Sequence, residues 1–192
     1  DIVGITGKSG SGKSTLMDIL LGLLEPTSGE VYIDQKKVTL TNNPGWFENI
    51  AHVPQKVFLT DASIAENVAF GQDEQRIDKD KLIKALELSQ LHNFISNNMT
   101  VQGSRLGENG INISGGQAQR IGIARAIYRD KPILMFDEAT SALDKDTQRE
   151  ILSNLVDTGK TVILITHDLD NLKYCSKVYC LKNGKLIENN HN

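Results

Sequence analysis

The sequence predicts an α/β fold, in which helices flank a mainly parallel central sheet, on three observations. First, apolar runs of strand length recur at residues 2–5, 50–53, 133–136, 162–165 and 178–181. Second, longer amphipathic stretches separate these runs. Third, residues 62–116 show helical spacing and no strand-like run. Strands that alternate with helices favour parallel pairing, because the helix carries the chain back across the sheet.

Two helices of the sheet domain can be placed directly from this alternation. Residues 13–23 read as a helix after the first apolar run, and residues 145–156 read as another after the third. Each predicted helix has one apolar face, as expected for a helix that packs on a sheet.

The stretch 62–116 predicts an inserted helical subdomain. Within it, residues 81–88 and 92–95 are apolar at helical spacing. The predicted division is therefore a core formed by residues 1–61 and 117–192, with the helical subdomain between them.

Composition and charge exclude several classes of protein. Hydrophobic residues make up 39% of the 192 residues and charged residues 23%, which is typical of a packed globule. The longest aliphatic runs, such as 162–165, are far shorter than the roughly 20 residues that span a bilayer. A net charge of −3 gives no general attraction to nucleic acid, so no nucleic-acid partner is expected.

A phosphate-binding loop follows the first predicted strand. The segment GKSGSGKST, residues 7–15, fits G-x-x-x-x-G-K-[ST] between a strand and a helix. Its glycines let backbone N–H groups turn toward phosphate oxygens, and the helix start adds its positive end. The residues expected at the phosphates are Gly7, Ser9, Gly10, Ser11, Gly12, Lys13, Ser14 and Thr15. The alternative, a flexible glycine-rich turn, does not explain this context.

Individual roles follow from the side chains of that loop. Lys13 is expected to reach the β- and γ-phosphates, and Ser14 to offer its hydroxyl to Mg²⁺. Thr15 is expected to support the loop or the start of the helix.

Two adjacent carboxylates, Asp137 and Glu138, end the third apolar run. Strand alternation predicts that they point in different directions, with Asp137 toward Mg²⁺ and Glu138 toward an attacking water. Glu138 is then the expected general base. The alternative is an acidic pair that simply ends a strand at the surface, and the phosphate loop argues against it.

A second anion-binding element is predicted at Ser114, Gly115, Gly116 and Gln117, which precede a strong helical pattern. A small hydroxyl and two glycines at a helix start leave N–H groups open to a phosphate. A simple helix cap would need only Ser114, and the two glycines would weaken the helix without a reason.

The segment ISGGQ, residues 113–117, resembles the signature motif of the ABC ATPase family, and it follows the phosphate loop at the distance typical of that family. The resemblance covers essentially the whole chain and implies three further landmarks. Gln55 resembles the Q-loop glutamine, Ser141 to Asp144 resemble the D-loop, and His167 resembles the switch histidine at the γ-phosphate. Each would be a weak signal alone, but their order and spacing agree.

The resemblance implies a P-loop NTPase that uses ATP and Mg²⁺. The implied metal ligands are Ser14, Gln55 and Asp137, and the implied catalytic residues are Glu138, His167, Lys13 and Gln55. In this family two such domains face each other head to tail, so the signature residues of one close on the ATP of the other. A homodimer is the expected arrangement, because one chain carries both halves of the composite site.

Two segments resemble the exporter branch of the family. Residues 63–71 resemble the stretch after the exporter Q-loop, and residues 105–110, with Glu108, resemble the X-loop that touches the membrane domain. The alternatives for these segments are a helix cap and a solvated glycine-rich loop. Contact with a transmembrane domain through the Q-loop and X-loop is therefore expected, at the cytoplasmic face of a membrane.

The implied function is ATP hydrolysis that drives an exporter or flippase through ATP-dependent dimerisation. The alternative is a soluble ABC ATPase that acts on ribosomes or DNA. Upstream sequence with about six apolar spans of roughly 20 residues would distinguish the two.

Two departures from the family pattern are visible. Exporters usually carry a basic residue after the signature glutamine, whereas this chain has Ala118 followed by Gln119. The aromatic residue that stacks on adenine lies upstream of the phosphate loop, and only six residues precede Gly7. We therefore expect a truncated antiparallel β subdomain, in which strands 30–34 and 37–40 lack their usual partners, and weakened nucleotide affinity.

Overall fold

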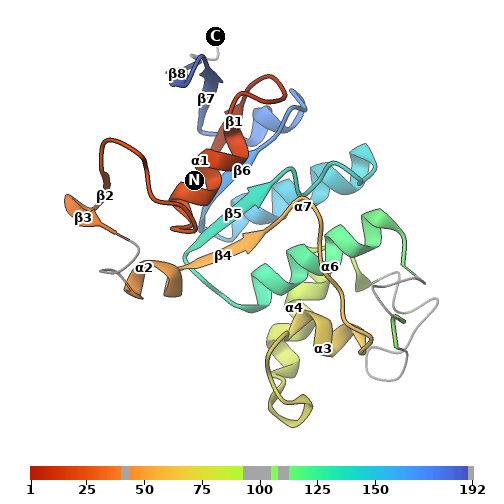
Figure 1. Ribbon diagram of the computed structural model, residues 1–192. Helices are drawn as coiled ribbons and strands as arrows, with labels where there is room; N and C mark the ends of the chain where they lie inside the picture. Colours follow the sequence, from red (N-terminus) through yellow and green to blue (C-terminus); the bar gives the residue numbers. More distant parts are fainter. Residues whose placement is uncertain (40–43, 93–104, 108–112, 190–192) are drawn as a thin grey trace.

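The computed structural model describes residues 1–39, 44–92, 105–107 and 113–189. A six-stranded sheet forms the centre, in the order β4-β5-β6-β1-β7-β8 (Figure 1). Its strands are β1 (Ile2–Thr6), β4 (Ile50–Val53), β5 (Ile133–Asp137), β6 (Thr161–Ile165), β7 (Lys177–Lys182) and β8 (Lys185–Glu188). The first five pair in parallel and β8 pairs antiparallel with β7. The predicted α/β fold with a mainly parallel sheet is thus confirmed.

Strand β8 has no counterpart in the sequence prediction. All four of its residues are exposed, so it lies at the edge of the sheet without the apolar run that reveals a buried strand. It forms because β7 offers its free edge.

The strand register brings the carboxyl ends of β1, β5 and β6 to one edge of the sheet. Ile5 is paired with Ile165, which in turn is paired with Asp137. The loop after β1, the end of β5 and the segment after β6 therefore begin side by side. Ligands of open α/β sheets bind at this carboxyl edge.

The two faces of the sheet are covered by different helices. On one face, Met17 of α1 (Lys13–Leu20) packs in a cluster with Ile5 and Met135. On the other face, Phe136 lies in one core with α6 (Gly115–Tyr128) and α7 (Lys145–Asp157). Neighbouring residues of β5 thus point to opposite layers, as strand alternation requires.

Helix α1 is shorter than the predicted 13–23. It ends at Leu20 because Gly22 adopts a left-handed conformation, with φ of 67°. The following N–H groups of Leu23 and Leu24 donate to the carbonyl of Asp18, at 2.7 and 3.2 Å, and so close the last turn.

A group of helices lies beyond the β4 side of the sheet (Figure 1). It consists of α3 (Ile64–Val68), the short 3₁₀ helix η1 (Glu74–Arg76) and α4 (Lys79–Leu88). The predicted helix 81–88 lies within α4, which begins earlier because Asp78 caps it. The predicted stretch 92–95 lies, except for His92, outside the described residues.

Helix α6 joins this group to the sheet, because it packs against α3, α4 and β4. Gly122 makes the close approach to the sheet possible: a Cβ there would lie 2.6 Å from Cγ2 of Val57 and 3.3 Å from Cγ1 of Val53. The boundary that we predict between residues 116 and 117 therefore falls inside this helix.

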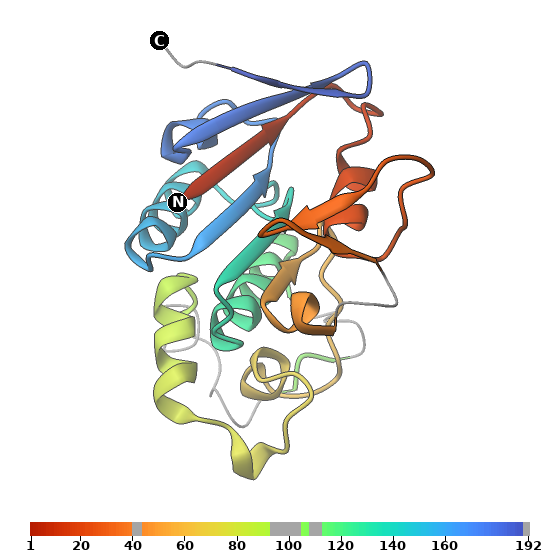
Figure 2. The same cartoon turned by 90° about the vertical axis from the view of Figure 1, so that its left-hand side faces the viewer.

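The antiparallel pair β2 (Val31–Ile33) and β3 (Lys36–Val38) forms a separate hairpin on the α1 side of the sheet (Figure 2). The turn residues Asp34 and Gln35 both have positive φ, 48° and 65°, which suits a two-residue hairpin. Within the described part of the chain these strands pair only with each other. Over the same part, no helix is long and apolar enough to cross a bilayer.

The short helix α2 (Pro44–Glu48) was not predicted. Its anchor is a tertiary contact, since the indole of Trp46 donates to the carbonyl of Leu20 at 2.7 Å. Such a contact has no local sequence signal.

Candidate nucleotide-binding site

The loop between β1 and α1 is shaped by its glycines. Gly10 and Gly12 have φ of 75° and 99°, a region in which side chains are rarely accommodated. Gly12 stands at the start of α1 and provides no side-chain cap. The first N–H groups of α1 have no partner within the helix, so they are available to an anion.

Lys13 is already folded into this loop. Its Nζ donates to the carbonyls of Gly7 and Lys8, at 3.0 and 3.2 Å, and the residue is only 8% exposed. The ammonium group is therefore held where phosphate oxygens would approach the loop.

A hollow of about 610 Å³ opens above the loop. It is lined by Gly7, Ser9, Gly10, Gly12, Lys13, Ser14, Thr15, Gln55, Glu138 and His167. The structure thus brings together residues from four separate segments, as the motifs predict. Ser11 is the one predicted phosphate-site residue of the loop outside this lining: its Oγ is buried and finds no hydrogen-bond partner among the described residues.

Asp137 lies at the end of β5 and shares a side-chain hydrogen bond with Ser14. Burial raises the pKa of this carboxyl group, and the nearby charge of Glu138 raises it further, while the bond from Ser14 opposes the rise. A hydroxyl and a partly buried carboxylate therefore lie together, and this pair of oxygen ligands suits Mg²⁺.

The expectation that strand alternation separates the two carboxylates needs a correction. Strand β5 ends at Asp137, and Glu138 adopts a left-handed conformation with φ of 50°. The turn, and not the pleat, sets the direction of Glu138. Such a conformation costs a residue with a side chain about 1–2 kcal/mol, so the surroundings must hold it.

The carboxylate of Glu138 is held between two predicted site residues. Gln55 donates from Nε2 to Oε2 at 2.8 Å, and Nδ1 of His167 lies 3.3 Å from Oε1. The Glu138 side chain is 19% exposed and that of His167 is 66% exposed. A water or a phosphate oxygen at the mouth of the hollow can reach both.

The second predicted anion-binding element forms a separate hollow of about 470 Å³. It is lined by Ser114, Gly115, Gly116, Gln117, Arg120, Ala142, Leu143 and Asp144. Ser114 and Gln117 form a reciprocal cap: Oγ of Ser114 accepts from the Gln117 N–H at 3.2 Å, and Oε1 of Gln117 accepts from the Ser114 N–H at 2.8 Å. No residue lines both hollows.

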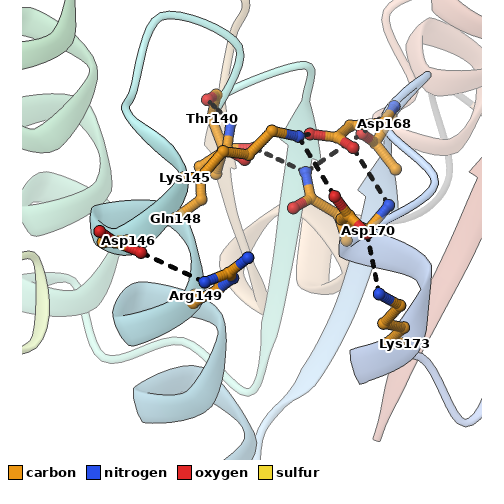
Figure 3. Close-up of polar contacts among 10 residues, drawn as sticks. Thr140, Lys145, Asp146, Gln148, Arg149, Asp168, Asp170 and Lys173 are labelled. Atoms are coloured by element: carbon orange, nitrogen blue, oxygen red, sulfur yellow. Dashed lines mark hydrogen bonds and ion pairs between the residues drawn. The ribbon is translucent and has the colours of Figure 1, made fainter.

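The segment after Glu138 is braced by residues that sequence reasoning missed. Gln148 of α7 donates to the carbonyl of Thr140 at 2.5 Å, and the ammonium of Lys145 pairs with Asp168 and Asp170 (Figure 3). Asp168 directly follows His167. Helix α7 is thereby tied through Gln148 to the segment that precedes it and through Lys145 to the segment that follows His167.

The sequence predicts no role for Gln119, which stands out only as the neighbour of the unusual Ala118. In the structure it is 5% exposed and hydrogen-bonds to Ser141 and Ala142. No sequence signal reports this contact, because the two segments are far apart along the chain.

A phosphate loop between strand β1 and helix α1, at the same sheet edge as the carboxylates at the end of β5, defines a P-loop nucleotide-binding protein. A family model described as "ABC transporter" matches residues 1–141. This match spans well over half of the chain, which therefore belongs to the ABC transporter family. The predicted family resemblance is confirmed.

Several relatives resemble the chain along almost all of its length. It is 38% identical to an ATP-dependent lipid A-core flippase of Ralstonia nicotianae, covering 98% of this chain and 32% of the relative. It is 39% identical to the leukotoxin translocation ATP-binding protein LktB of a Pasteurella haemolytica-like species, covering 98% and 27%. The chain thus spans 27–32% of the length of these curated relatives.

A solved structure agrees with the fold. A bacterial Atm1-family ABC exporter with ATP bound is similar with a TM-score of 0.87 and 32% identity, covering 97% of this chain and 33% of that one.

Proposed function

We propose that this chain binds Mg-ATP in the hollow above the phosphate loop and hydrolyses it to ADP and phosphate. The observation that carries the proposal is the placement of Glu138. Its carboxylate lies at the mouth of the hollow, between Gln55 at 2.8 Å and His167 at 3.3 Å. A carboxylate so placed can accept a proton from a water that attacks the γ-phosphate.

The other loop residues bind and orient the nucleotide. Lys13 leaves the loop carbonyls to contact the β- and γ-phosphates, and the N–H groups at the start of α1 surround their oxygens. His167 contacts the γ-phosphate from the opposite rim. None of these residues has to be brought to the site by nucleotide binding, because all of them already line the hollow.

Mg²⁺ fits the residues present. Ser14 and Asp137 already share a hydrogen bond, and the pKa of Asp137 is raised chiefly because burial removes its carboxylate from water. A divalent cation held by Ser14, Asp137 and Gln55 would stabilise the ionised carboxylate and neutralise phosphate charge.

The complete hydrolytic site requires a second copy of the domain. The signature hollow, with Ser114, Gly115, Gly116 and Gln117, shares no lining residue with the phosphate-loop hollow of the same chain. Head-to-tail association of two copies closes each ATP between a phosphate loop and the partner's signature residues. Asp144 of the D-loop lines the signature hollow, and both D-loop residues, Ser141 and Asp144, are assigned to this contact.

The proposed role of hydrolysis is to drive an exporter or flippase at the cytoplasmic face of a membrane. The names of the relatives support this choice over a ribosome- or DNA-directed ATPase. Coupling to the membrane domain is assigned to Gln55 and to the X-loop at 105–110. The X-loop starts beside the Q-loop segment, since Arg105 pairs with Asp61 at 3.6 Å and the Gly107 N–H donates to the same carboxylate at 3.1 Å. Glu108 lies outside the described residues.

The test compares the wild-type protein with Glu138→Gln. ATP turnover should fall by about 10²–10⁴-fold, the usual contribution of a general base, while binding of ATP is kept. In solution, the variant should have the mass of a dimer only when Mg-ATP is present, because hydrolysis no longer separates the two copies. Unchanged turnover would exclude Glu138 as the base. A variant that stays monomeric at saturating ATP would exclude dimerisation driven by ATP alone.

A further inference from the structure

Gln119 links the signature segment to the general base of the same chain. It lies on α6, five residues after Ser114, and is 5% exposed. Its amide Nε2 is 3.2 Å from Oγ of Ser141 and 3.5 Å from the carbonyl oxygen of Glu138. Its Oε1 accepts from the Ala142 N–H at 2.8 Å. One side chain therefore holds three points of the turn that follows β5.

This turn needs external support. Glu138 has a φ of 50°, an unfavourable value for a residue with a side chain. Its backbone is held by two bonds, from its own N–H to the Ile165 carbonyl at 3.0 Å and from the Ser141 N–H to its carbonyl at 3.1 Å. Loss of the amide of Gln119 would leave the partly buried Ala142 N–H without its acceptor and loosen the same turn.

The start of α6 also touches this turn through backbone. A Cβ at Gly116 would lie 2.9 Å from the carbonyl oxygen of Ala142. The glycine therefore allows the signature segment to rest directly on the turn. A shift of α6 that accompanies contact with a partner's nucleotide cannot occur without a response in the turn, because packed segments transmit displacement.

We propose that Gln119 is a positioning residue for Glu138, and that through it the signature segment of a chain is coupled to the base of that same chain. The inference rests on the proposed hydrolysis of ATP. In a head-to-tail pair it connects the two composite sites: closure of Ser114 on the partner's ATP steadies Glu138 beside the chain's own ATP.

The test is the variant Gln119→Leu in the protein at its natural length. Leu keeps the approximate volume and removes the three polar contacts. Turnover should be expressed per nucleotide site, counted with a fluorescent non-hydrolysable ATP analogue, so that unfolded protein is not scored as slow enzyme. We expect kcat to fall about 10-fold or more, since a small displacement of a reacting group is costly, with KM for ATP within about twofold.

Gln148→Leu is the matched control. Gln148 is equally buried, at 5% exposed, and it braces the same turn from α7 by donating to the Thr140 carbonyl; among the described residues its side chain has no hydrogen bond to Glu138. It should lower the melting temperature about as much as Gln119→Leu and leave kcat within about threefold.

A double-mutant cycle tests whether Gln119 acts through Glu138. In the Glu138→Gln background, adding Gln119→Leu should change the residual turnover by less than about twofold, because the group that it positions is already gone. A further tenfold loss would overturn the proposal.

The remaining outcomes separate the two proposals. Wild-type protein that hydrolyses no ATP, or that is insensitive to Glu138→Gln, overturns the proposed function and the inference with it. Turnover that depends on Glu138 but is unchanged by Gln119→Leu overturns the inference alone, as does an equal loss of kcat in Gln148→Leu.

Discussion

The starts of α1 and α6 are the two proposed anion sites, and they differ in how their backbone N–H groups are already satisfied. Helix α1 follows Gly12, which has no side chain to cap it, and the side chain of Lys13 folds back into the loop. Helix α6 follows Ser114, whose hydroxyl already accepts from the Gln117 N–H. Arg120, the cation that lines the second hollow, donates to the carbonyl of Gln90 at 2.7 Å.

We infer from this difference that the two proposed anion sites bind phosphate in different ways. The α1 start offers open N–H groups and a cation within a hollow, as tight binding of several phosphates requires. The α6 start has part of its donors satisfied, so it can add a contact to a phosphate that is already bound elsewhere. We therefore expect nucleotide affinity to depend on the first site, and turnover to depend on both.

The largest effect should come from Lys13→Met. Removing a charged donor to phosphate, worth about 1.5–3 kcal/mol, should weaken ATP binding about 10- to 100-fold and abolish measurable turnover. Met keeps the aliphatic stem, so the fold should be preserved. Binding is best measured by titration calorimetry; affinity equal to the wild type would contradict the division into two kinds of site.

Ser114→Asp should have the opposite pattern of effects, with turnover reduced and ATP binding kept. Asp still caps α6, but its carboxylate would repel a phosphate of the partner's ATP. ATP binding by the separate chain should stay within about threefold of the wild type, while turnover falls about 10-fold or more, as for loss of one stabilising donor. Loss of binding in this variant would show that the signature residues belong to the first site.

A smaller effect distinguishes the two signature glycines. Gly116→Ala places a Cβ 2.9 Å from the Ala142 carbonyl oxygen, whereas Gly115→Ala places one 3.8 Å from the Ala142 Cβ, an ordinary contact. Overpacking should cost the first variant about 1–3 kcal/mol of unfolding free energy. The second should be neutral or slightly stabilising, because Ala favours helix over Gly. Denaturant unfolding of both would settle this; equal stabilities would contradict a tight contact between α6 and the turn.

The smallest effect concerns Asp137. Its pKa is raised in the folded protein, chiefly by burial, so the ionised form destabilises the fold above that raised value. The cost fades as pH falls through the folded pKa toward the unfolded one. Asp137→Asn should therefore raise the melting temperature of the nucleotide-free protein by about 1–2 °C at pH 7–8, with no gain at acid pH.

Thermal melts across pH, with and without Mg²⁺, test this expectation. Mg²⁺ should stabilise the wild type and not Asp137→Asn, since the variant lacks the charged ligand. A lower melting temperature for the variant at neutral pH would show that the carboxylate stabilises the fold instead.

Local patterns were sufficient for much of the fold and site. The apolar runs located β1, β4, β5, β6 and β7, and the G-x-x-x-x-G-K-[ST] pattern located the phosphate loop, because both depend on neighbouring residues. The end of α1 was misplaced because the run of leucines beyond Gly22 keeps an apolar pattern that the left-handed glycine interrupts. Strand β8 and helix α2 were missed because their partners, and not their own residues, decide them.

The sequence by itself determined the main alternation of strands and helices, the phosphate loop and the residues that we propose for the chemistry. Only the tertiary structure decided that Glu138 leaves the strand, that Gln55 and His167 hold its carboxylate, and that Gln119 braces the turn behind it. The physical reason is sequence separation. Periodicity and turn chemistry act over a few residues, whereas these contacts join segments that meet only when the parallel strands align at one edge of the sheet.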